Sequence, residues 1–486
     1  MRISHLFILL AASAMLTACD FLDEYNPNSV TVGNYYTSEE DIVASLNGVY
    51  TSLTQSYVAD NYHYFTDVRA NATVVTNSGA NSGIPYQFYN YTLTEENVYV
   101  YNRYSQLYKI ISRANTLFAH LGDVSYATPS ARDTYEAEAR FLRALSYYWL
   151  VTEWGDVPLV LKVLESTEEV RANNYRRPKA EIYQAIFDDL KYVTESPLLD
   201  VQPASACGKV SKAAAWALWG KALLQQACDE DFIGSKSELL GQAIGKLTAA
   251  WDLRKFGELS SVSYSSVWDL STQKSCAENI FQVNYIQGNA DLGSVWNYMY
   301  GPEGAGVTSQ RKGEMQNVTI QAVYDSFEPG DVRRSFLRAT NKAGQTYYHT
   351  MKYADLECGA NGYGGNNWIV LRYADVALML AEAYYWQGVS PMAETYLNMV
   401  RRRAGLADWS GSDLRQGIYD ERLFEFIQEG LRWQDVLRMY SNEEMIEHYN
   451  AINSNFSVKD LLLPIPYNER ILNPEGLYQN PGYGVK

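Results

Sequence analysis

The 486-residue chain is poor in the residues that many metal centres and active sites use. It contains five histidines and five cysteines, with no H-E-x-x-H or C-x-x-C spacing, which argues against a zinc site and a dense disulfide framework. No G-x-S-x-G elbow occurs, and the glycine-rich stretch at 359–367 lacks the Lys-Ser/Thr of a phosphate loop. We therefore expect neither catalysis nor a cofactor. A glycosidase's carboxylate pair stays open, because 56 acidic residues offer too many choices.

Basic residues are also few. Lys and Arg total 40 against 56 Asp and Glu, which gives a formal net charge of −16. No basic stretch is long enough to follow the phosphates of a nucleic acid. We therefore expect no nucleic-acid partner, and the composition favours a neutral or cationic ligand over a polyanion.

Long apolar runs are missing except near the N-terminus. Leu6 to Leu16 is too short to span a bilayer, and the residues before Cys19 resemble a bacterial lipobox. We predict a signal peptide at 1–18, acylation of Cys19 after cleavage, and a lipidated tether at 19–37. A plain signal peptide is the alternative. No later segment has eighteen consecutive apolar residues, so the mature protein is expected to be anchored to a membrane without spanning it.

Aromatic residues, in contrast, are abundant, with 40 tyrosines in the chain. Residues 86–108 alone carry seven of them. Three recur at helical spacing and are predicted to belong to a helix core: Tyr101, Tyr104 and Tyr108. Three others precede that helix and follow a polar loop, which makes them candidate platforms for a ligand: Tyr86, Tyr89 and Tyr91.

Helical periodicity dominates from about residue 38. Ser38 is predicted to cap a first helix. Thr128 and Pro129 are predicted to begin another, which ends at Gly155. Further helices are predicted at 179–195, 211–228, 238–251, 370–387 and 391–404.

The last two helices carry a repeat signature. Small, aromatic and aliphatic residues recur at offsets of 0, 3, 7, 12, 16 and 19, at Ala381, Tyr384, Gly388, Ala393, Leu397 and Val400. A tetratricopeptide-type helix–turn–helix places such residues at these offsets, because its two helices approach closely. Ala243, Leu247 and Ala250 repeat the second-helix part. The chain is longer than one core usually supports, so either two domains or a helical-repeat body is expected, and this pattern favours the helical-repeat body.

Non-helical sequence falls into a few long segments. Only the alternation of Phe281, Val283 and Tyr285 predicts a short strand. Segments at about 57–100, 286–315 and 340–368 have no helical period. We expect them to be irregular insertions, where binding residues concentrate.

Six charged residues interrupt otherwise apolar helical sequence. Side chains of this kind usually pair with one another between packed helices. A structural role is therefore predicted for Arg372, Asp375, Glu382, Glu429, Arg432 and Asp435.

Several segments, in one order along the chain, resemble the SusD/RagB-like lipoproteins of Bacteroidetes. They include "CDFLDEYNP", "AEARFLRALSYYWLVTEWGDVPLV", "LRYADVALMLAEAYYWQG", "ERLFEFIQEGLRWQDVLR" and "LLLPIPYNERILNPEGLYQNPGY". The resemblance implies a mainly α fold: a tetratricopeptide-like helical repeat body of about four helix pairs, with irregular loop-rich insertions and a few short strands. It implies one domain at 38–486, with an N-terminal part at about 38–255 and a C-terminal part at about 256–486.

The resemblance also implies an outer-membrane lipoprotein at the cell surface that captures an oligosaccharide for a SusC-like TonB-dependent transporter. Aromatic platforms with polar partners suit such a ligand, and the candidates in the non-helical segments are Tyr86, Tyr89, Tyr91, Trp296, Tyr298 and Trp368, with Asp67 and Arg69. Some relatives take peptides, so a peptide ligand is the alternative. A surface glycoside hydrolase and a purely structural lipoprotein are the remaining hypotheses.

Overall fold

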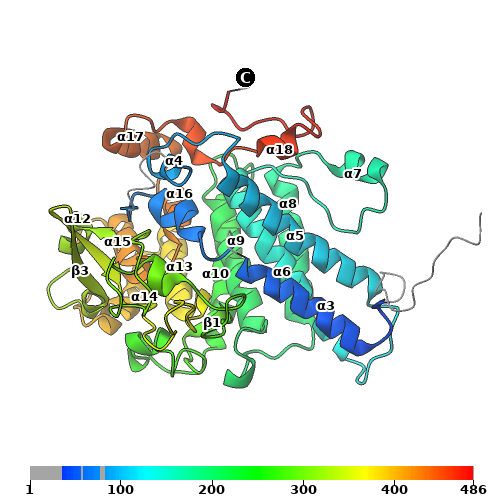
Figure 1. The fold of residues 1–486 in the computed structure, drawn as a ribbon, viewed down its shortest axis with the longest axis horizontal. Coiled ribbons are helices and arrows are strands. Elements are labelled where there is room, and N and C mark those ends of the chain that lie inside the picture. Colours follow the sequence, from blue (N-terminus) through cyan, green and yellow to red (C-terminus); the bar gives the residue numbers. More distant parts are fainter. Residues whose placement is uncertain (1–34, 56–57, 77–82, 485–486) are drawn as a thin grey trace, which may run out of the picture.

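The computed structural model describes residues 35–55, 58–76 and 83–484 (Figure 1). The predicted signal peptide, the predicted lipidation site Cys19 and the tether up to residue 34 lie outside the described residues. Among the described residues, no helix is long and apolar enough to cross a membrane.

Helices make up most of the described chain. The longer ones are α3 (Glu39–Thr51), α5 (Val98–His120), α6 (Ala131–Trp154), α8 (Lys179–Glu195), α9 (Lys212–Ala227), α10 (Lys236–Asp252), α13 (Tyr373–Trp386), α14 (Ser390–Arg403), α15 (Leu414–Phe426), α16 (Arg432–Met439) and α17 (Asn442–Ile452). The short ones are a π-helical turn (Tyr64–Val68), α4 (Tyr86–Tyr89), α7 (Thr167–Asn173), α11 (Trp296–Met299), α12 (Gln321–Asp325) and α18 (Tyr467–Arg470).

The long helices pack on one another in chain order. α5 packs on α6, α6 on α8, α8 on α9, α9 on α10, α10 on α13 and α13 on α14. Figure 1 shows α3, α5, α6 and α8 on the right, α9 and α10 in the middle, and α13 to α15 on the left. The prediction of a mainly α, helical-repeat body with few short strands is confirmed.

The predicted helix ends are correct at α3 and partly wrong at α6. Ser38 is the N-cap of α3, and its N–H donates to the Asp41 carboxylate at 2.9 Å. α6 ends at Gly155 as predicted, where φ is 74°. However, α6 begins at Ala131 with Ser130 as N-cap, because the N–H of Ala131 donates to the Thr128 carbonyl at 3.1 Å and closes a turn before the helix. Thr128 and the following proline therefore belong to that turn.

Close helix approach explains the small residues of the predicted repeat. Ala243, Leu247 and Ala250 of α10 are buried. Gly220 of α9 faces them: a Cβ there would stand 2.5 Å from Cγ of Leu247. The two helices can therefore pack at this distance only with glycine at position 220.

Two small sheets lie among the helices. β1 (Asn279–Val283) pairs antiparallel with β5 (Trp368–Arg372). The second sheet has the order β2-β4-β3, formed by β2 (Thr319–Ile320), β3 (Leu337–Lys342) and β4 (Gln345–Thr350). The hairpin of β3 and β4 overlaps the segment that was expected to be irregular.

The strand prediction near residue 281 is confirmed in position but not in pattern. Ile280 and Gln282 are buried as well as Phe281, so both faces of the strand are covered; helix α9 packs against the ribbon, and Phe281 contacts Phe141 of α6. The helix predicted at 370–387 starts too early. Val370 to Arg372 belong to β5, where pairing with β1 overrides their helical preference, and α13 begins at Tyr373.

The six charged residues that were predicted to lie within helical sequence have the structural role that was predicted for them, although Arg372 lies in β5 and Glu429 in a turn. Asp375 pairs with Lys221 and Arg422, each at 2.8 Å, and Glu382 pairs with Arg438 at 2.8 Å. Arg372 lies among three carboxylates, those of Glu278, Glu425 and Glu429. Asp435 pairs with Arg438, and the Arg432 guanidinium lies over the Tyr419 ring. These buried pairs hold α13, α15 and α16 together.

Candidate functional site

Two of the candidate tyrosines lie on the short helix α4. The rings of Tyr86 and Tyr89 have their centroids 5.6 Å apart and their planes 53° apart. Both side chains are half-buried, whereas Phe88 between them is fully buried against Phe65. Since Phe88 anchors the helix in the core, α4 is held with its two tyrosines toward the surface.

A third tyrosine borders the same place. Tyr347 of β4 and Tyr89 both pack against a small apolar cluster of Val74, Met315 and Val318. Burial raises the pKa of Tyr89, with smaller contributions from the neighbouring phenols of Tyr86 and Tyr347. The three rings therefore lie close enough for their phenol groups to influence one another.

A series of polar side chains runs from the π-helical turn, which packs against α4, into the segment after α11. The Tyr64 hydroxyl, beside Phe88, donates to Oε1 of Gln316 at 2.7 Å. Gln316 donates in turn to the Glu314 carboxylate. The other Glu314 oxygen accepts from Arg311 at 3.0 Å, and the Arg311 guanidinium lies 3.8 Å from the centre of the Tyr298 ring.

The outer end of this series is open to solvent. The side chains of Arg311 and Glu314 are 39% and 29% exposed. Because the Tyr298 ring holds the guanidinium flat and Glu314 fixes its direction, the pair presents donors and an acceptor in one orientation. We call Tyr86, Tyr89, Tyr347, Arg311, Glu314 and Gln316 together the α4 surface.

The remaining candidates face the protein interior. Tyr91 has a φ of 53°, which turns its ring into contact with Phe456, and its hydroxyl donates to the Arg69 carbonyl at 3.0 Å. Arg69 is buried, with its guanidinium 4.1 Å from the centre of the Trp433 ring. Asp67 is buried too and accepts from the Gly430 N–H at 3.1 Å. Burial raises the pKa of the Asp67 carboxyl to about 7.

The two candidate tryptophans are also buried. Trp296 packs against Tyr285, and Trp368 stacks on Trp149 at 5.7 Å with an interplanar angle of 14°. Tyr298 is 8% exposed and serves as the support for Arg311. Of the eight candidate ligand contacts, Tyr86 and Tyr89 are thus the two that are not buried.

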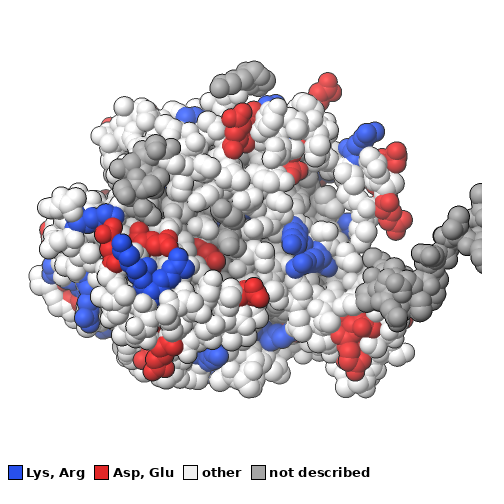
Figure 2. All heavy atoms as spheres, viewed as in Figure 1, with Lys and Arg blue, Asp and Glu red and all other residues white. Residues whose placement is uncertain are grey.

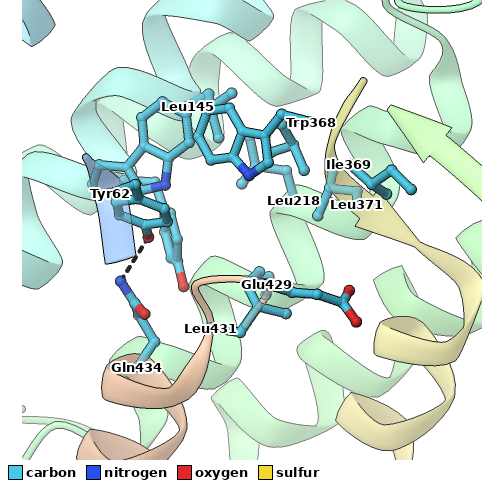
Figure 3. A pocket seen from close by; sticks show the side chains of 13 residues that line it. Tyr62, Leu145, Leu218, Trp368, Ile369, Leu371, Glu429, Leu431 and Gln434 are labelled. Atoms are coloured by element: carbon cyan, nitrogen blue, oxygen red, sulfur yellow. Dashed lines mark hydrogen bonds between the residues drawn. The ribbon is translucent and has the colours of Figure 1, made fainter. Parts of the chain in front are cut away.

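A cavity beneath Trp368 is too small for a sugar. It has a volume of about 20 Å³, enough for one water molecule. Figure 3 shows Tyr62 and Trp368 on one side of it, Gln434 hydrogen-bonded to Tyr62, and the Glu429 carboxylate pointing away from Tyr62. The Tyr148 hydroxyl lines this cavity and has no partner among the described residues, so a single water fits its chemistry.

Charged side chains are unevenly distributed on the face drawn in Figure 2. Basic and acidic groups gather on the left, near the elements α12, β3 and α14 of Figure 1, and further charged groups lie along the right, whereas the middle of the face carries few charges. Among the described residues, no group of three or more His, Cys, Asp or Glu is arranged to hold a metal ion.

The segments that form the α4 surface could be predicted from the sequence, but most of its individual residues could not. Arg311 and Glu314 fall in the segment at 286–315, and Tyr347 in the segment at 340–368, both of which were expected to carry ligand contacts. No local pattern singled these residues out. Their grouping depends on backbone bonds between segments, such as the Thr76 N–H to the Met315 carbonyl at 3.2 Å.

The fold and the α4 surface define a helical-repeat protein whose loops build a polar, aromatic surface. Comparison with protein-family models gives two matches. Residues 314–483 match the SusD family, and residues 20–224 match the family described as starch-binding associating with outer membrane. The chain belongs to the SusD/RagB-like family.

Curated relatives match along the whole chain. SusD-like protein P2 of Formosa agariphila is 27% identical over 521 residues, which cover 99% of this chain and 99% of the relative. SusD-like protein P25 of the same organism is 24% identical, over 99% of this chain and 100% of the relative.

Solved structures share the fold. Surface glycan-binding protein A from Bacteroides uniformis has a TM-score of 0.77 and 22% identity, and covers 91% of this chain and 99% of its own. Surface glycan-binding protein A from Bacteroides thetaiotaomicron, solved in complex with laminarihexaose, has a TM-score of 0.76 and 20% identity, with 91% and 99% coverage.

Proposed function

We propose that this chain is a cell-surface lipoprotein that binds an oligosaccharide without chemical change and delivers it to a SusC-like TonB-dependent transporter. Membership of the SusD/RagB-like family supports the class. The observation that carries the ligand assignment is the α4 surface, where the half-buried tyrosine rings of α4 are linked through Tyr64 and Gln316 to an oriented Arg311–Glu314 pair. A structural neighbour of this chain was solved with a glycan, laminarihexaose.

The α4 surface offers both kinds of contact that a sugar needs. The C–H faces of a pyranose ring are apolar and pack on aromatic rings such as those of Tyr86 and Tyr89. Sugar hydroxyls both donate and accept, and they find a donor in Arg311 and an acceptor in Glu314. Because these groups are fixed by other protein contacts before the ligand arrives, little conformational entropy is lost on binding.

Anchoring and delivery complete the proposal. Acylation of Cys19 would hold the protein at the outer membrane, in keeping with the outer-membrane association in the description of the N-terminal family match. The tether at 19–37 would join this anchor to one ligand-binding domain at 38–486. The captured ligand would then pass to the transporter, whose uptake step the TonB system drives.

A calorimetric panel of purified protein against neutral oligosaccharides and peptides tests the ligand class. The panel includes laminarihexaose and maltohexaose, with product analysis of each mixture after incubation. Saturable heat with an oligosaccharide and recovery of that oligosaccharide unchanged is the expected result. If only peptides bind, the ligand is a peptide and the glycan assignment is wrong. If a glycan is turned over, the protein is a hydrolase and not a binding protein.

A further inference from the structure

A cavity of about 260 Å³ lies where three helices end. Thr152, Gln225 and Leu437 line it, and they belong to the last turns of α6, α9 and α16. Leu461 and Leu462 of the C-terminal segment supply apolar lining. The volume is several times the roughly 30 Å³ that one water molecule takes up in the liquid, so a small organic molecule fits. We call this space the helix-end cavity.

Acidic groups outnumber basic ones in the lining of this cavity. Asp229, Glu230 and Asp231 contribute three carboxylates just after the end of α9. Lys179, at the start of α8, pairs with Asp229 at 2.7 Å and with Asp231 at 3.0 Å. The third carboxylate, that of Glu230, accepts from the Asn442 N–H at 2.9 Å. One ammonium group therefore faces three carboxylates.

The second basic residue of the lining, Lys459, does not offset this excess. Its ammonium group donates to the Tyr91 carbonyl at 2.6 Å and to the Asp460 carboxylate at 2.5 Å, and neither acceptor lines the cavity. The three helix ends add to the negative potential, because the last carbonyls of a helix have no partner within it and carry partial negative charge. The helix-end cavity is thus rich in hydrogen-bond acceptors and negative in potential.

Two buried polar side chains line the cavity with a group left unpaired. Tyr183 is 2% exposed, and its hydroxyl has no hydrogen-bond partner among the described residues. Gln225 is 5% exposed, and its side-chain oxygen accepts from Arg438 at 3.2 Å, whereas its NH₂ group finds no acceptor in the same part of the chain. Both groups remain accessible from the cavity.

The Tyr183 hydroxyl lies toward the acidic side of the cavity. Burial raises the pKa of Tyr183, and the negative charge of Asp229 raises it further. A polar group that is buried without a partner costs stability, and a ligand that pairs with it recovers this cost. The unpaired hydroxyl and amide therefore point to a ligand rather than to a role in the core.

A divalent metal ion fits this site poorly. Among the described residues, no group of three or more His, Cys, Asp or Glu is arranged to hold one. Burial raises the pKa of the Cys228 thiol in the lining to about 12, so near neutral pH it is not a thiolate ligand. Lys179 would also repel a divalent ion more strongly than a singly charged group.

We propose that the helix-end cavity binds the primary ammonium group of a small organic molecule, such as an amino sugar. An ammonium group has three donors and no acceptor, which complements a lining rich in acceptors. The carboxylates of Asp229 and Glu230 would balance its charge, and the Tyr183 hydroxyl would accept one of its N–H bonds. The Gln225 NH₂ group would donate to a hydroxyl of the same molecule. This proposal goes beyond the proposed function and does not rest on it, because no residue of the α4 surface lines the cavity.

Ligand-observed NMR titration of the purified protein with a matched pair of sugars tests the proposal. Glucosamine and N-acetylglucosamine share one ring, but only glucosamine carries an ammonium group. Cadaverine supplies ammonium groups without a sugar. We expect glucosamine to bind saturably and about tenfold or more tightly than N-acetylglucosamine. Tighter binding of glucosamine than of cadaverine would assign an amino sugar, and the reverse would assign an aliphatic amine; both outcomes support an ammonium site.

Tyr183→Phe separates a binding role from a structural one. It removes an unpaired hydroxyl and keeps the ring, so the urea midpoint should stay the same or rise, whereas glucosamine binding should weaken by about tenfold. Tyr373→Phe is the matched control, because its hydroxyl is also buried without a partner among the described residues but does not line the cavity. Asp229→Asn should weaken binding by about tenfold as well, and Asp252→Asn, at an exposed aspartate of α10, should change nothing.

Three results would overturn the proposal. They are equal binding of glucosamine and N-acetylglucosamine, no saturable binding of any amine, and wild-type affinity in both Tyr183→Phe and Asp229→Asn. Calcium chloride that binds in place of the amines, with a dependence on Asp229, would also overturn it, because the site would then hold a metal ion.

The failure of this proposal is separable from failure of the proposed function. Tyr86→Ala/Tyr89→Ala should leave glucosamine binding unchanged, and Tyr183→Phe should leave the binding of neutral oligosaccharides unchanged. Loss of glucosamine binding in the double variant would place the amine on the α4 surface and remove the helix-end cavity as its site.

Discussion

Asp67 illustrates how burial decides what a single residue can do. From the sequence, its carboxylate is a candidate partner for sugar hydroxyls. In the fold it is 1% exposed, one oxygen accepts from Gly430, and the other has no partner among the described residues. Loss of hydration raises its pKa to about 7. Near neutral pH this carboxyl therefore exists partly as the neutral acid.

The raised pKa predicts a pH-dependent gain for Asp67→Asn. An unfolded aspartic acid has a pKa of about 3.9, so between pH about 4 and 7 the folded state keeps a proton that the unfolded state has released. This contribution to wild-type stability falls as pH rises through that window. Relative to wild type, the variant should therefore gain about 2 kcal/mol between pH about 5 and 8.

Urea denaturation of both proteins at several pH values measures this gain. Titration of other groups, including the buried His63, cancels in the comparison because both proteins share them. Asp291→Asn, at an exposed aspartate, is the control and should reproduce the wild-type pH profile. A stability difference between Asp67→Asn and wild type that stays constant with pH would contradict the assignment.

At the scale of elements, the contact between α9 and α10 shows why the repeat needs small residues. Alanine is normally favoured over glycine within a helix by about 1 kcal/mol. Position 220, in the middle of α9, is nevertheless a glycine. An added Cβ would stand 2.5 Å from Cγ and 3.1 Å from the backbone nitrogen of Leu247. Since the backbone of α10 is involved, a side-chain rotation alone cannot make room.

Gly220→Ala is therefore expected to lower the free energy of unfolding by about 1–3 kcal/mol despite its better helix propensity. Gly245→Ala in α10 is the matched control. It is exposed and a Cβ there meets nothing within 4 Å, so it should stabilise by about 0.5–1 kcal/mol. Chemical denaturation measures both. Equal effects of the two substitutions would show that helix approach does not require Gly220.

Sequence periodicity predicted the elements whose burial follows a local pattern. Ala393 and Leu397 are fully buried in α14 as their spacing indicates. Contacts between distant segments could not be predicted in this way. Val370 lies in a strand rather than a helix because β5 pairs with β1. The ring of Tyr91 points inward because its φ is positive, whereas Tyr86 is half-buried. The aromatic composition indicates that rings are available as ligand platforms, but which of these rings are exposed depends on tertiary packing.

At the scale of the whole molecule, the proposed function joins the helical body to a proposed ligand surface and a proposed lipid anchor. The body is fixed by the packing of successive helices from α5 to α14. The α4 surface draws on three segments far apart in sequence, around Tyr86, Arg311 and Tyr347. Because only the folded repeat brings these segments together, ligand binding and folding should be lost together on denaturation.

The anchor yields a prediction of its own. Cys19→Ser in the full-length chain should abolish incorporation of a radiolabelled fatty acid and move the protein out of the outer-membrane fraction. Ligand binding by the purified variant should be unchanged, since Cys19 is far along the chain from every residue of the α4 surface. Cys207→Ser, at a cysteine within the described chain, is the control and should remain membrane-associated. Fatty-acid labelling that persists in Cys19→Ser would contradict anchoring at this residue.

The central claim is that the α4 surface captures the oligosaccharide. Isothermal titration of the tightest-binding oligosaccharide into wild type, Tyr86→Ala/Tyr89→Ala and Tyr467→Ala tests it most directly. Tyr467 is a suitable control, because it is 41% exposed on α18. We predict that the double variant loses about tenfold or more in affinity, since it removes both aromatic platforms, and that Tyr467→Ala matches wild type. Wild-type affinity in the double variant would contradict the account.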